Sequence, residues 1–446
     1  MIAGSSSTSP SFLIALIESA TKSGRRFLGG AGHGRAPVPS TDLIKIAEEL
    51  LSRRGEASGI ALAERLLAAY EWSSTEKRLE FLFALANDFG PNMEALTKAL
   101  DTVNRDPSPD HLNALHAVSE PRRQQLFRRI NLAGGGTKSL IAMREDLLGN
   151  LQKYPELKRV DADFSHLFAS WFNRGFLVLK RIDWETPANI LEKIIQYEAV
   201  HEIADWSDLR NRVQPSDRRC YAFFHPQLVD EPLIFVEVAL TTEMPLRIQP
   251  LLKIDRKFVP ESDATTAVFY SISNTQKGLR GVSFGNFLIK QVVQDLKAEL
   301  PNLRNFATLS PAPRFSKWLS TRAGNGQPQI QCAPLNALND PAWFDDEKMV
   351  ETIGPYLMRM AALYYLDSRG SNGRTIDPVA QFHLGNGARL ESINILGDRS
   401  EKGIAQSHGL MVNYVYHLAD IEANHEAFAE RGEIIAAPHI RKLLES

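Results

Sequence analysis

Cysteine is almost absent from this chain, and its scarcity excludes several kinds of chemistry. Only Cys220 and Cys332 occur among 446 residues, and they form no Cys-x-x-Cys pair. Two isolated thiols make neither a disulfide framework nor a cysteine-rich zinc site. We therefore expect two reduced cysteines and no bound metal.

A charge excess of one sign and a long apolar run are also lacking. The 51 Lys and Arg residues nearly cancel the 53 Asp and Glu residues, which leaves a net charge of −2. Without a basic excess, we expect no binding to nucleic acid or to an anionic membrane. No run approaches the roughly 18 apolar residues that span a bilayer. At about 100 to 200 residues per domain, the length indicates two or three domains.

Acidic residues are scarce at the N-terminus. Residues 1–40 are rich in Ser and Gly, and they contain four basic residues but a single acid, Glu18. This composition is typical both of an organellar transit peptide and of a disordered bacterial N-terminus. We favour a flexible tail over residues 1–39 and a cytoplasmic protein. The location would be mitochondrial if residues 1–40 are a transit peptide.

The segment after the tail has helical periodicity and no strand-like alternation. Its first apolar stripe has the i, i+3, i+4, i+7, i+8 spacing of one helix face, and it consists of Leu43, Ile46, Ala47, Leu50 and Leu51. Either Ser40 or Thr41 is suited to cap that helix. Further helical segments follow, separated by Gly and Pro. The sequence predicts a helical bundle domain over residues 40–173, serving as a scaffold or as an oligomerisation surface.

The pattern changes near Gly175. Short apolar runs at 219–225, 232–242, 265–273 and 303–309 predict strands, and residues 284–300 predict an amphipathic helix. A strand, a glycine-bearing loop, a helix and a strand form a β-α-β unit. The predicted fold class is therefore α+β, with an N-terminal all-α helical bundle followed by a mixed α/β domain over residues 174–446.

The loop between the third strand and this helix is a candidate phosphate site. Gly278 and Gly281 allow tight backbone bending and close approach to a ligand, and Lys277 and Arg280 add positive charge. Backbone amides at a helix start favour an anion. The loop lacks the Gly-Lys-Ser/Thr ending of a Walker A motif and the Gly-x-Gly-x-x-Gly pattern. On these residues alone, a plain strand-to-helix turn is the more frequent explanation.

This loop resembles the acyl-CoA pyrophosphate loop of the GNAT N-acetyltransferase superfamily. Its spacing, Gln276-x-Gly278-x-x-Gly281, departs from the usual Gln/Arg-x-x-Gly-x-Gly/Ala. Four longer sequence motifs, in matching order over about residues 170–420, resemble those of the malonyl-CoA decarboxylase family. They lie at residues 271–282, 309–319, 383–388 and 409–416. The resemblance implies a GNAT-like mixed α/β domain behind the family's N-terminal helical bundle.

The same resemblance implies the conversion of malonyl-CoA to acetyl-CoA and CO2 through an enolate that is protonated at carbon. The thioester is itself the electron sink, so we expect no cofactor, with CoA entering only as part of the substrate. Such a site needs donors for an oxyanion, a carboxylate pocket that excludes water, and a proton donor.

By resemblance, Ser310 positions the malonyl carboxylate or the thioester, and His383 donates the proton or binds the carboxylate. Tyr416 matches a family tyrosine near the site, where it would contact His383 or the thioester. On the residues alone, these three would be a turn serine, a structural histidine and a half-buried strand tyrosine. The resemblance assigns CoA binding to Gln276, Lys277, Gly278, Leu279, Arg280, Gly281 and Val282.

One position departs from the family pattern. Some members have Glu in a Gly-Val-Glu-Leu-Gly word where this chain has Ser283, so a role for that carboxylate is in doubt here. Two alternatives remain open from the sequence. One is an acyl-CoA-dependent N-acyltransferase of the GNAT superfamily, and the other is a non-catalytic acyl-CoA-binding protein. The resemblance also suggests a homo-oligomer, a dimer or a tetramer, formed through the helical domain.

Overall fold

A computed structural model describes residues 42–52, 55–282, 288–324, 337–338, 340, 342–370, 373 and 375–445. The predicted tail, Ser283 and Cys332 lie outside these residues. The chain divides into two compact units. The first unit comprises Met1–Phe172 together with Gln276–Val282, and the second comprises Asn173–Thr275 with Ser283–Ser446.

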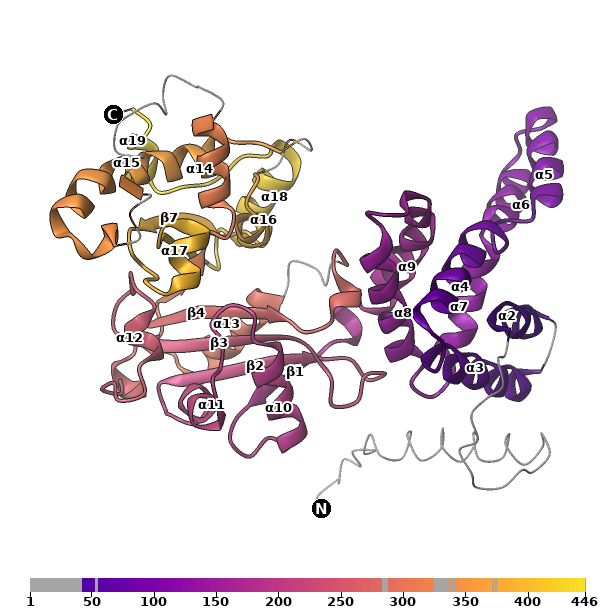
Figure 1. The fold of residues 1–446 in the computed structure, drawn as a ribbon, viewed down its shortest axis with the longest axis horizontal. Coiled ribbons are helices and arrows are strands. Elements are labelled where there is room, and N and C mark those ends of the chain that lie inside the picture. The colour runs from indigo at the N-terminus through magenta and orange to yellow at the C-terminus, as the bar shows by residue number, and fades with distance from the viewer. Residues whose placement is uncertain are drawn as a thin grey trace, which may run out of the picture. The chain divides into compact units, whose positions relative to one another are not determined.

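The first unit is helical, as the periodicity predicted (Figure 1). The predicted stripe on the first helix is buried at Leu43, Ile46, Ala47 and Leu50. Asp42 is the N-cap of that helix, and its side chain accepts from the backbone amides of Ile44 and Lys45. The expected caps, Ser40 and Thr41, lie outside the described residues. The α-helices are α2 (Leu43–Leu51), α3 (Glu56–Glu71), α4 (Thr75–Asn87), α5 (Met93–Arg105), α6 (Pro109–Ser119), α7 (Arg122–Asn131), α8 (Gly136–Asn150) and α9 (Lys158–Trp171).

The second unit is built on an eight-stranded sheet with the order β1-β2-β3-β4-β5-β8-β6, in which β7 also pairs with β8. The β4–β5 pair is parallel, and every other pair is antiparallel. The predicted β-α-β unit is present, because α13 connects β4 to β5. The strands are β1 (Val178–Ile182), β2 (Arg218–Phe224), β3 (Pro232–Thr241), β4 (Thr266–Asn274), β5 (Asn305–Thr308), β6 (Ser310–Pro311), β7 (Arg389–Asn394) and β8 (Met411–Val415).

Helices connect and follow the strands of the second unit (Figure 1). They are α10 (Ala188–Tyr197), α11 (Trp206–Val213), α12 (Gln249–Leu252), α13 (Leu288–Glu299), α14 (Phe315–Gly324), α15 (Glu347–Leu366), α16 (Pro378–Gly385), α17 (Glu401–Ser407), α18 (Ile421–Arg431) and α19 (Pro438–Lys442). Helices α11, α12, α14 and α17 and strands β6 and β7 were not predicted. Strand β7 mixes polar and apolar residues, Arg-Leu-Glu-Ser-Ile-Asn, and it is a strand because β8 supplies its hydrogen bonds.

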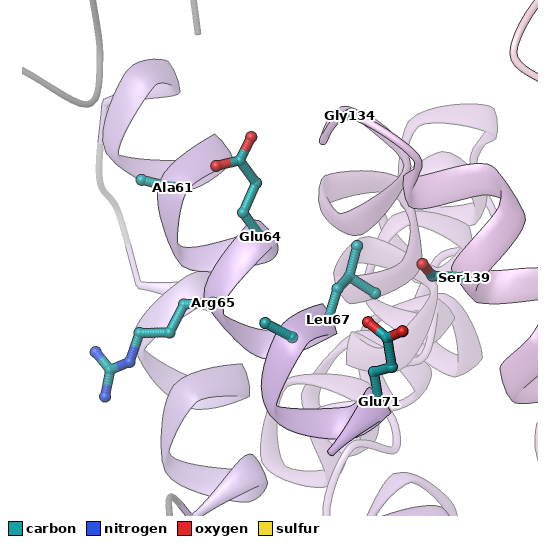
Figure 2. Close-up of a pocket in the computed structure, with 8 residues that line it drawn as sticks. Ala61, Glu64, Arg65, Leu67, Glu71, Gly134 and Ser139 are labelled. Atoms are coloured by element: carbon teal, nitrogen blue, oxygen red, sulfur yellow. The ribbon is translucent and has the colours of Figure 1, made fainter. Parts of the chain in front are cut away.

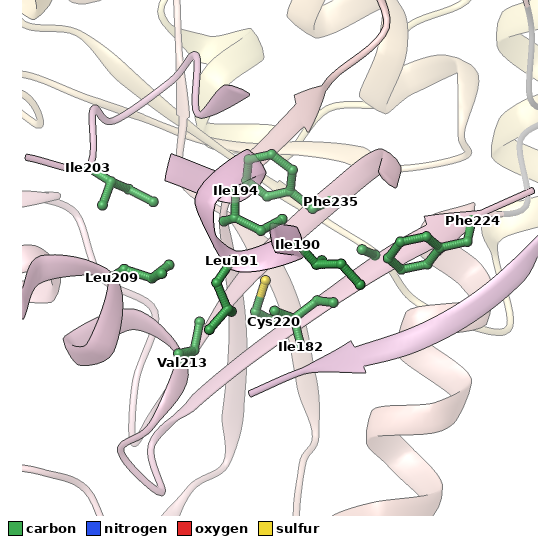
Figure 3. Packing of buried hydrophobic residues seen from close by; sticks show 11 residues of the cluster. Ile182, Ile190, Leu191, Ile194, Ile203, Leu209, Val213, Cys220, Phe224 and Phe235 are labelled. Atoms are coloured by element: carbon green, nitrogen blue, oxygen red, sulfur yellow. The ribbon is translucent and has the colours of Figure 1, made fainter. Parts of the chain in front are cut away.

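An apolar cluster lies between α10, α11 and the first strands of the sheet (Figure 3). Ile194 and Leu209 contribute from the two helices, and Phe235 contributes from β3. Cys220 is a free thiol at the centre of this cluster, and its burial raises its pKa well above the usual range. This cysteine is therefore a packing residue. Within the described ranges, no helix combines the length and the apolar character needed to cross a bilayer.

Candidate active site

Ser310, His383 and Tyr416 come together in the second unit, although they belong to three separate segments. Ser310 begins β6, His383 lies on α16, and Tyr416 follows β8. The Ser310 Oγ atom lies 3.1 Å from Nε2 of His383, and Nδ1 of His383 lies 2.8 Å from the Tyr416 hydroxyl. All three side chains are buried. The imidazole thus has a hydroxyl partner at each of its nitrogens.

The start of α16 fixes the position of His383. Asp377 is the N-cap, and its Oδ1 accepts from the backbone amides of Val379 and Ala380 at 2.9 Å. Its other oxygen, Oδ2, accepts from the Tyr364 hydroxyl at 2.9 Å. A capped helix start holds the turns that follow it, because it satisfies amides that have no partner within the helix. Asp377 and Tyr364 therefore anchor the helix that carries His383.

Aromatic rings pack against both His383 and Tyr416. The ring of Tyr414 stacks on His383 with centroids 4.8 Å apart and an angle of 27° between the planes. Phe269 meets the ring of Tyr416 edge-on at 6.4 Å. Tyr414 was not among the predicted site residues. Its position two residues before Tyr416 could have identified it, since side chains at i and i+2 of an extended chain lie on the same face.

Two further polar residues, Thr308 and Asn413, were also missed. The Ser310 hydroxyl donates to Thr308 Oγ1 at 2.9 Å, and the backbone amide of Tyr414 donates to the same oxygen at 3.2 Å. The side-chain amide of Asn413 donates to the backbone carbonyl of Thr308 at 2.8 Å. These side chains bridge β5 and β8, whose strand register pairs Ala307 with Val415. Ser310 is thereby held against β8.

Burial sets the charge state of this site. Desolvation lowers the pKa of His383 to about 3, so the imidazole is neutral near pH 7. Burial also raises the pKa of the Tyr416 phenol well above its usual range, so the phenol keeps its proton. The three side chains thus form an uncharged hydrogen-bonded set. Such a set can donate a hydrogen bond to a carbonyl or carboxylate oxygen without carrying a positive charge itself.

The predicted CoA-binding loop, residues 276–282, belongs to the first unit, and its lysine and arginine are exposed. Lys277 Nζ lies 3.7 Å from a Glu145 carboxylate oxygen. Gly281 has φ +80°, a left-handed conformation that favours glycine. Gly278 and Leu279 are buried. The charged side chains of the loop therefore reach solvent, while its middle is packed.

The close approach that Gly278 permits is to a neighbouring helix. A Cβ atom at Gly278 would lie 2.0 Å from the backbone oxygen of Ile141 on α8. In addition, Arg144 Nη1 donates to the Gly278 carbonyl at 2.7 Å. The small size of Gly278 therefore serves its contact with α8. Packing within the first unit already requires it, and its part in CoA binding stays a prediction.

A cavity of about 580 Å³ opens on the first unit beside α3 (Figure 2). Glu64, Arg65 and Glu71 line it from α3, with Gly134 and Ser139 on the opposite side. None of the predicted site residues contributes to its lining. In the described part of the chain, no group of three or more His, Cys, Asp or Glu side chains is placed to hold a metal ion.

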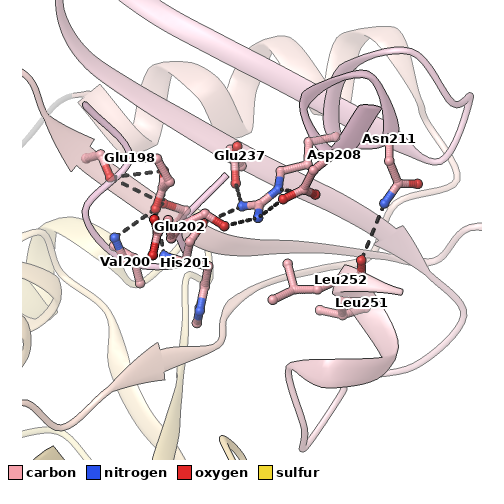
Figure 4. A network of polar contacts seen from close by, with 12 residues as sticks. Glu198, Val200, His201, Glu202, Asp208, Asn211, Glu237, Leu251 and Leu252 are labelled. Carbon is pink, nitrogen blue, oxygen red and sulfur yellow. Dashed lines mark hydrogen bonds and ion pairs between the residues drawn. The ribbon is translucent and has the colours of Figure 1, made fainter. Parts of the chain in front are cut away.

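A second buried polar cluster lies between α11 and the sheet (Figure 4). Arg212 donates to Glu237 on β3 at 3.2 Å and to Asp208 at 3.0 Å. Glu198 accepts from the hydroxyl of Ser271 on β4 at 2.7 Å. Desolvation, followed by the nearby Glu198 charge, raises the pKa of Glu237 to about 8. The network orders the α10–α11 connection, and it contains none of the predicted site residues.

Comparisons with known proteins identify the family. Family models described as the malonyl-CoA decarboxylase N-terminal and C-terminal domains match residues 89–172 and 175–446. The mitochondrial malonyl-CoA decarboxylase of Anser anser anser is 36% identical over 82% of this chain and 79% of its own length. The mitochondrial malonyl-CoA decarboxylase of Mus musculus is 36% identical over 73% of this chain and 71% of its own.

Two solved structures extend this result. The malonyl-CoA decarboxylase of Rhodopseudomonas palustris is 58% identical, covers 91% of this chain and 100% of its own, and superposes with a TM-score of 0.88. The malonyl-CoA decarboxylase of Agrobacterium vitis is 53% identical with the same coverage and a TM-score of 0.86. With matched models over most of its length, the chain belongs to the malonyl-CoA decarboxylase family.

Proposed function

We propose that this protein decarboxylates malonyl-CoA to acetyl-CoA and CO2, as the names of its relatives describe for those proteins. Family membership supports the reaction. The observation that carries the assignment to a site is the buried set of Ser310, His383 and Tyr416, linked at 3.1 and 2.8 Å. These are also the residues that the family resemblance assigned to catalysis.

In the proposed reaction, the bond between the carboxylate carbon and the α-carbon breaks, and CO2 leaves. The bonding electrons move toward the thioester carbonyl and form an enolate, whose oxygen becomes negative. The Ser310 hydroxyl is placed to donate to that oxygen or to the malonyl carboxylate. A preorganised donor in a buried site stabilises developing charge more than water does.

The enolate carbon then takes up a proton. His383, bonded to Ser310 on one side and to Tyr416 on the other, is placed to supply it through this hydrogen-bonded set, which solvent then refills. The net reaction consumes one proton per turnover. The packing of Tyr414 on His383 and of Phe269 on Tyr416 supports the water exclusion that a carboxylate needs before it leaves as CO2.

The CoA part of the substrate is assigned to residues 276–282. The exposed charges of Lys277 and Arg280 suit phosphate groups, and Gly281 supplies the turn. Gln276, Leu279 and Val282 complete the loop. The proposed reaction requires no cofactor besides the CoA that the substrate carries. A homo-oligomer formed through the helical domain and a cytoplasmic location complete the proposal, testable by light scattering and by fractionation of the native source.

One assay tests the activity. Purified protein receives malonyl-CoA without any acceptor, and release of CO2 and acetyl-CoA is followed. We expect turnover by the wild type and a loss of at least about 100-fold in His383→Ala and Ser310→Ala. The matched controls His116→Ala and Ser320→Ala alter exposed residues, and they should keep full activity. No acetyl-CoA from folded wild-type protein would refute the proposal, and product only with an added amine would indicate an acyltransferase.

A further inference from the structure

The direction of the hydrogen bonds around Ser310 can be worked out by counting protons. The Ser310 hydroxyl has one proton, and it donates that proton to Thr308 Oγ1 at 2.9 Å. The amide of Tyr414 donates to the same Thr308 oxygen at 3.2 Å. Both acceptor positions of the Thr308 hydroxyl are therefore used. Ser310 Oγ is left able only to accept from its other neighbour.

That other neighbour is Nε2 of His383, at 3.1 Å. Since Ser310 has no second proton to give, Nε2 must be the protonated nitrogen and the donor. A neutral imidazole has a single N–H, so Nδ1 is bare and accepts from the Tyr416 hydroxyl at 2.8 Å. The bonds run in one direction, from Tyr416 through His383 and Ser310 to Thr308.

We propose that Thr308 is a positioning residue for the decarboxylation, which accepts the Ser310 proton in the substrate-free site and thereby keeps the imidazole proton of His383 on Nε2. Thr308 ends β5 and is fully buried, so no water competes for that proton. A charged substrate oxygen accepts a hydrogen bond more strongly than a neutral hydroxyl does. The Ser310 proton therefore turns from Thr308 to the substrate, while the bond from Nε2 to Ser310 persists.

Thr308→Val tests this role, because valine keeps the shape of threonine and removes the acceptor. In this variant, Nε2 of His383 becomes the acceptor for the Ser310 proton, so the imidazole proton moves to Nδ1 and donates to Tyr416. We expect kcat to fall roughly 10- to 100-fold with KM for malonyl-CoA within about twofold, and Thr308→Ser to recover kcat within about threefold. The matched control is Thr266→Val, a buried threonine at the start of β4, which should leave kcat unchanged.

Nitrogen-15 NMR of histidine-labelled protein reads the tautomer directly, because protonated and bare ring nitrogens resonate far apart. The His383 signal is the one that disappears in His383→Gln. We expect a protonated Nε2 in the wild type and a protonated Nδ1 in Thr308→Val. A wild-type imidazole protonated at Nδ1, or an unchanged tautomer in the variant, would overturn the proposal. Thr308→Ala serves the same test if the valine variant does not fold.

A double-mutant comparison separates positioning from simple loss of structure. If Thr308 acts through Ser310, then Thr308→Val added to Ser310→Ala costs no further activity. If Thr308→Val instead lowers kcat by the same factor in the wild type and in Ser310→Ala, then Thr308 acts independently of Ser310, contrary to the proposal. The measurements of kcat and KM rest on the proposed function, whereas the NMR measurement of the His383 tautomer does not. Absence of turnover in the wild type would therefore refute the function and leave Thr308 to be judged by the tautomer.

Discussion

The imidazole of His383 lies against the ring of Tyr414, with centroids 4.8 Å apart and planes 27° from parallel. This stack covers one face of the imidazole, while its two nitrogens lie 3.1 Å from Ser310 and 2.8 Å from Tyr416. The ring is thereby fixed in both position and rotation.

Replacing Tyr414 tests the stack. Tyr414→Phe keeps the ring and should leave kcat within about twofold, whereas Tyr414→Leu removes the ring plane and should lower kcat about 10-fold or more by loosening His383. Steady-state kinetics with malonyl-CoA measure both, and circular dichroism checks the fold. Equal activity in the two variants would show that the aromatic face does not position the imidazole.

The pH profile should reflect a neutral histidine. Burial lowers the pKa of His383 to about 3, so this group does not change charge between about pH 5 and pH 8. We expect kcat to show no acid limb near the ordinary histidine pKa of about 6.5. The measurement is kcat at saturating malonyl-CoA across this range, in buffers of constant ionic strength. An acid limb near pH 6.5 that persists with folded protein would argue that His383 is protonated in the substrate complex.

Reversing the loop charges tests CoA binding. The double variant Lys277→Glu with Arg280→Glu places two acids where phosphates are expected, so KM should rise about 10-fold at low salt and less at high salt. The control is Lys98→Glu with Arg105→Glu on α5, which makes the same change in net charge. If the loop variant keeps the KM of the control at low salt, residues 276–282 do not bind the CoA phosphates.

Gly278→Ala tests the packing of the same loop on α8. The added Cβ would lie 2.0 Å from the Ile141 oxygen, and a backbone atom cannot move aside cheaply. We expect a loss of about 2 to 4 kcal/mol in unfolding free energy. Gly59→Ala on α3, where nothing lies within 4 Å of the new Cβ, should instead stabilise by up to about 1 kcal/mol. Urea denaturation measures both variants, and an unaffected Gly278→Ala protein would contradict the packing seen here.

Glu237 should make stability depend on pH. Its folded-state pKa is raised from 4.5 to about 8, so the folded protein retains a proton that the unfolded chain releases above about pH 4.5. Stability from this group therefore falls as the pH rises from about 4.5 to about 8. Glu237→Gln cannot release that proton, so its melting temperature should fall less over this range than that of the wild type. Identical pH dependence in the two proteins would remove Glu237 as the cause.

The structure also shows which elements local sequence could predict. Strands β2, β3 and β4 were predicted because their apolar residues are contiguous, and a strand buried on both faces needs such a run. The α2 stripe was predicted because its spacing is that of a helix face. Strand β7 was missed because its residues have no such pattern, and its extended form depends on pairing with β8. Such a strand forms only through pairing with a distant segment, and a short stretch of sequence does not contain that partner.

The scarcity of cysteine, the helical first segment and the four family motifs were readable from the sequence alone, because composition and short spacing are local properties. The hydrogen bond between Ser310 and His383 was not, since 73 positions separate them along the chain. For Tyr416 the family resemblance left open a contact with His383 or with the thioester, and the structure places its hydroxyl on His383 across 33 positions. Only the folded sheet brings these segments together. The sequence alone likewise could not show that α8 requires Gly278, or that Thr308 receives the Ser310 proton. These contacts arise when distant backbones pack, and packing decides which hydroxyl faces which acceptor.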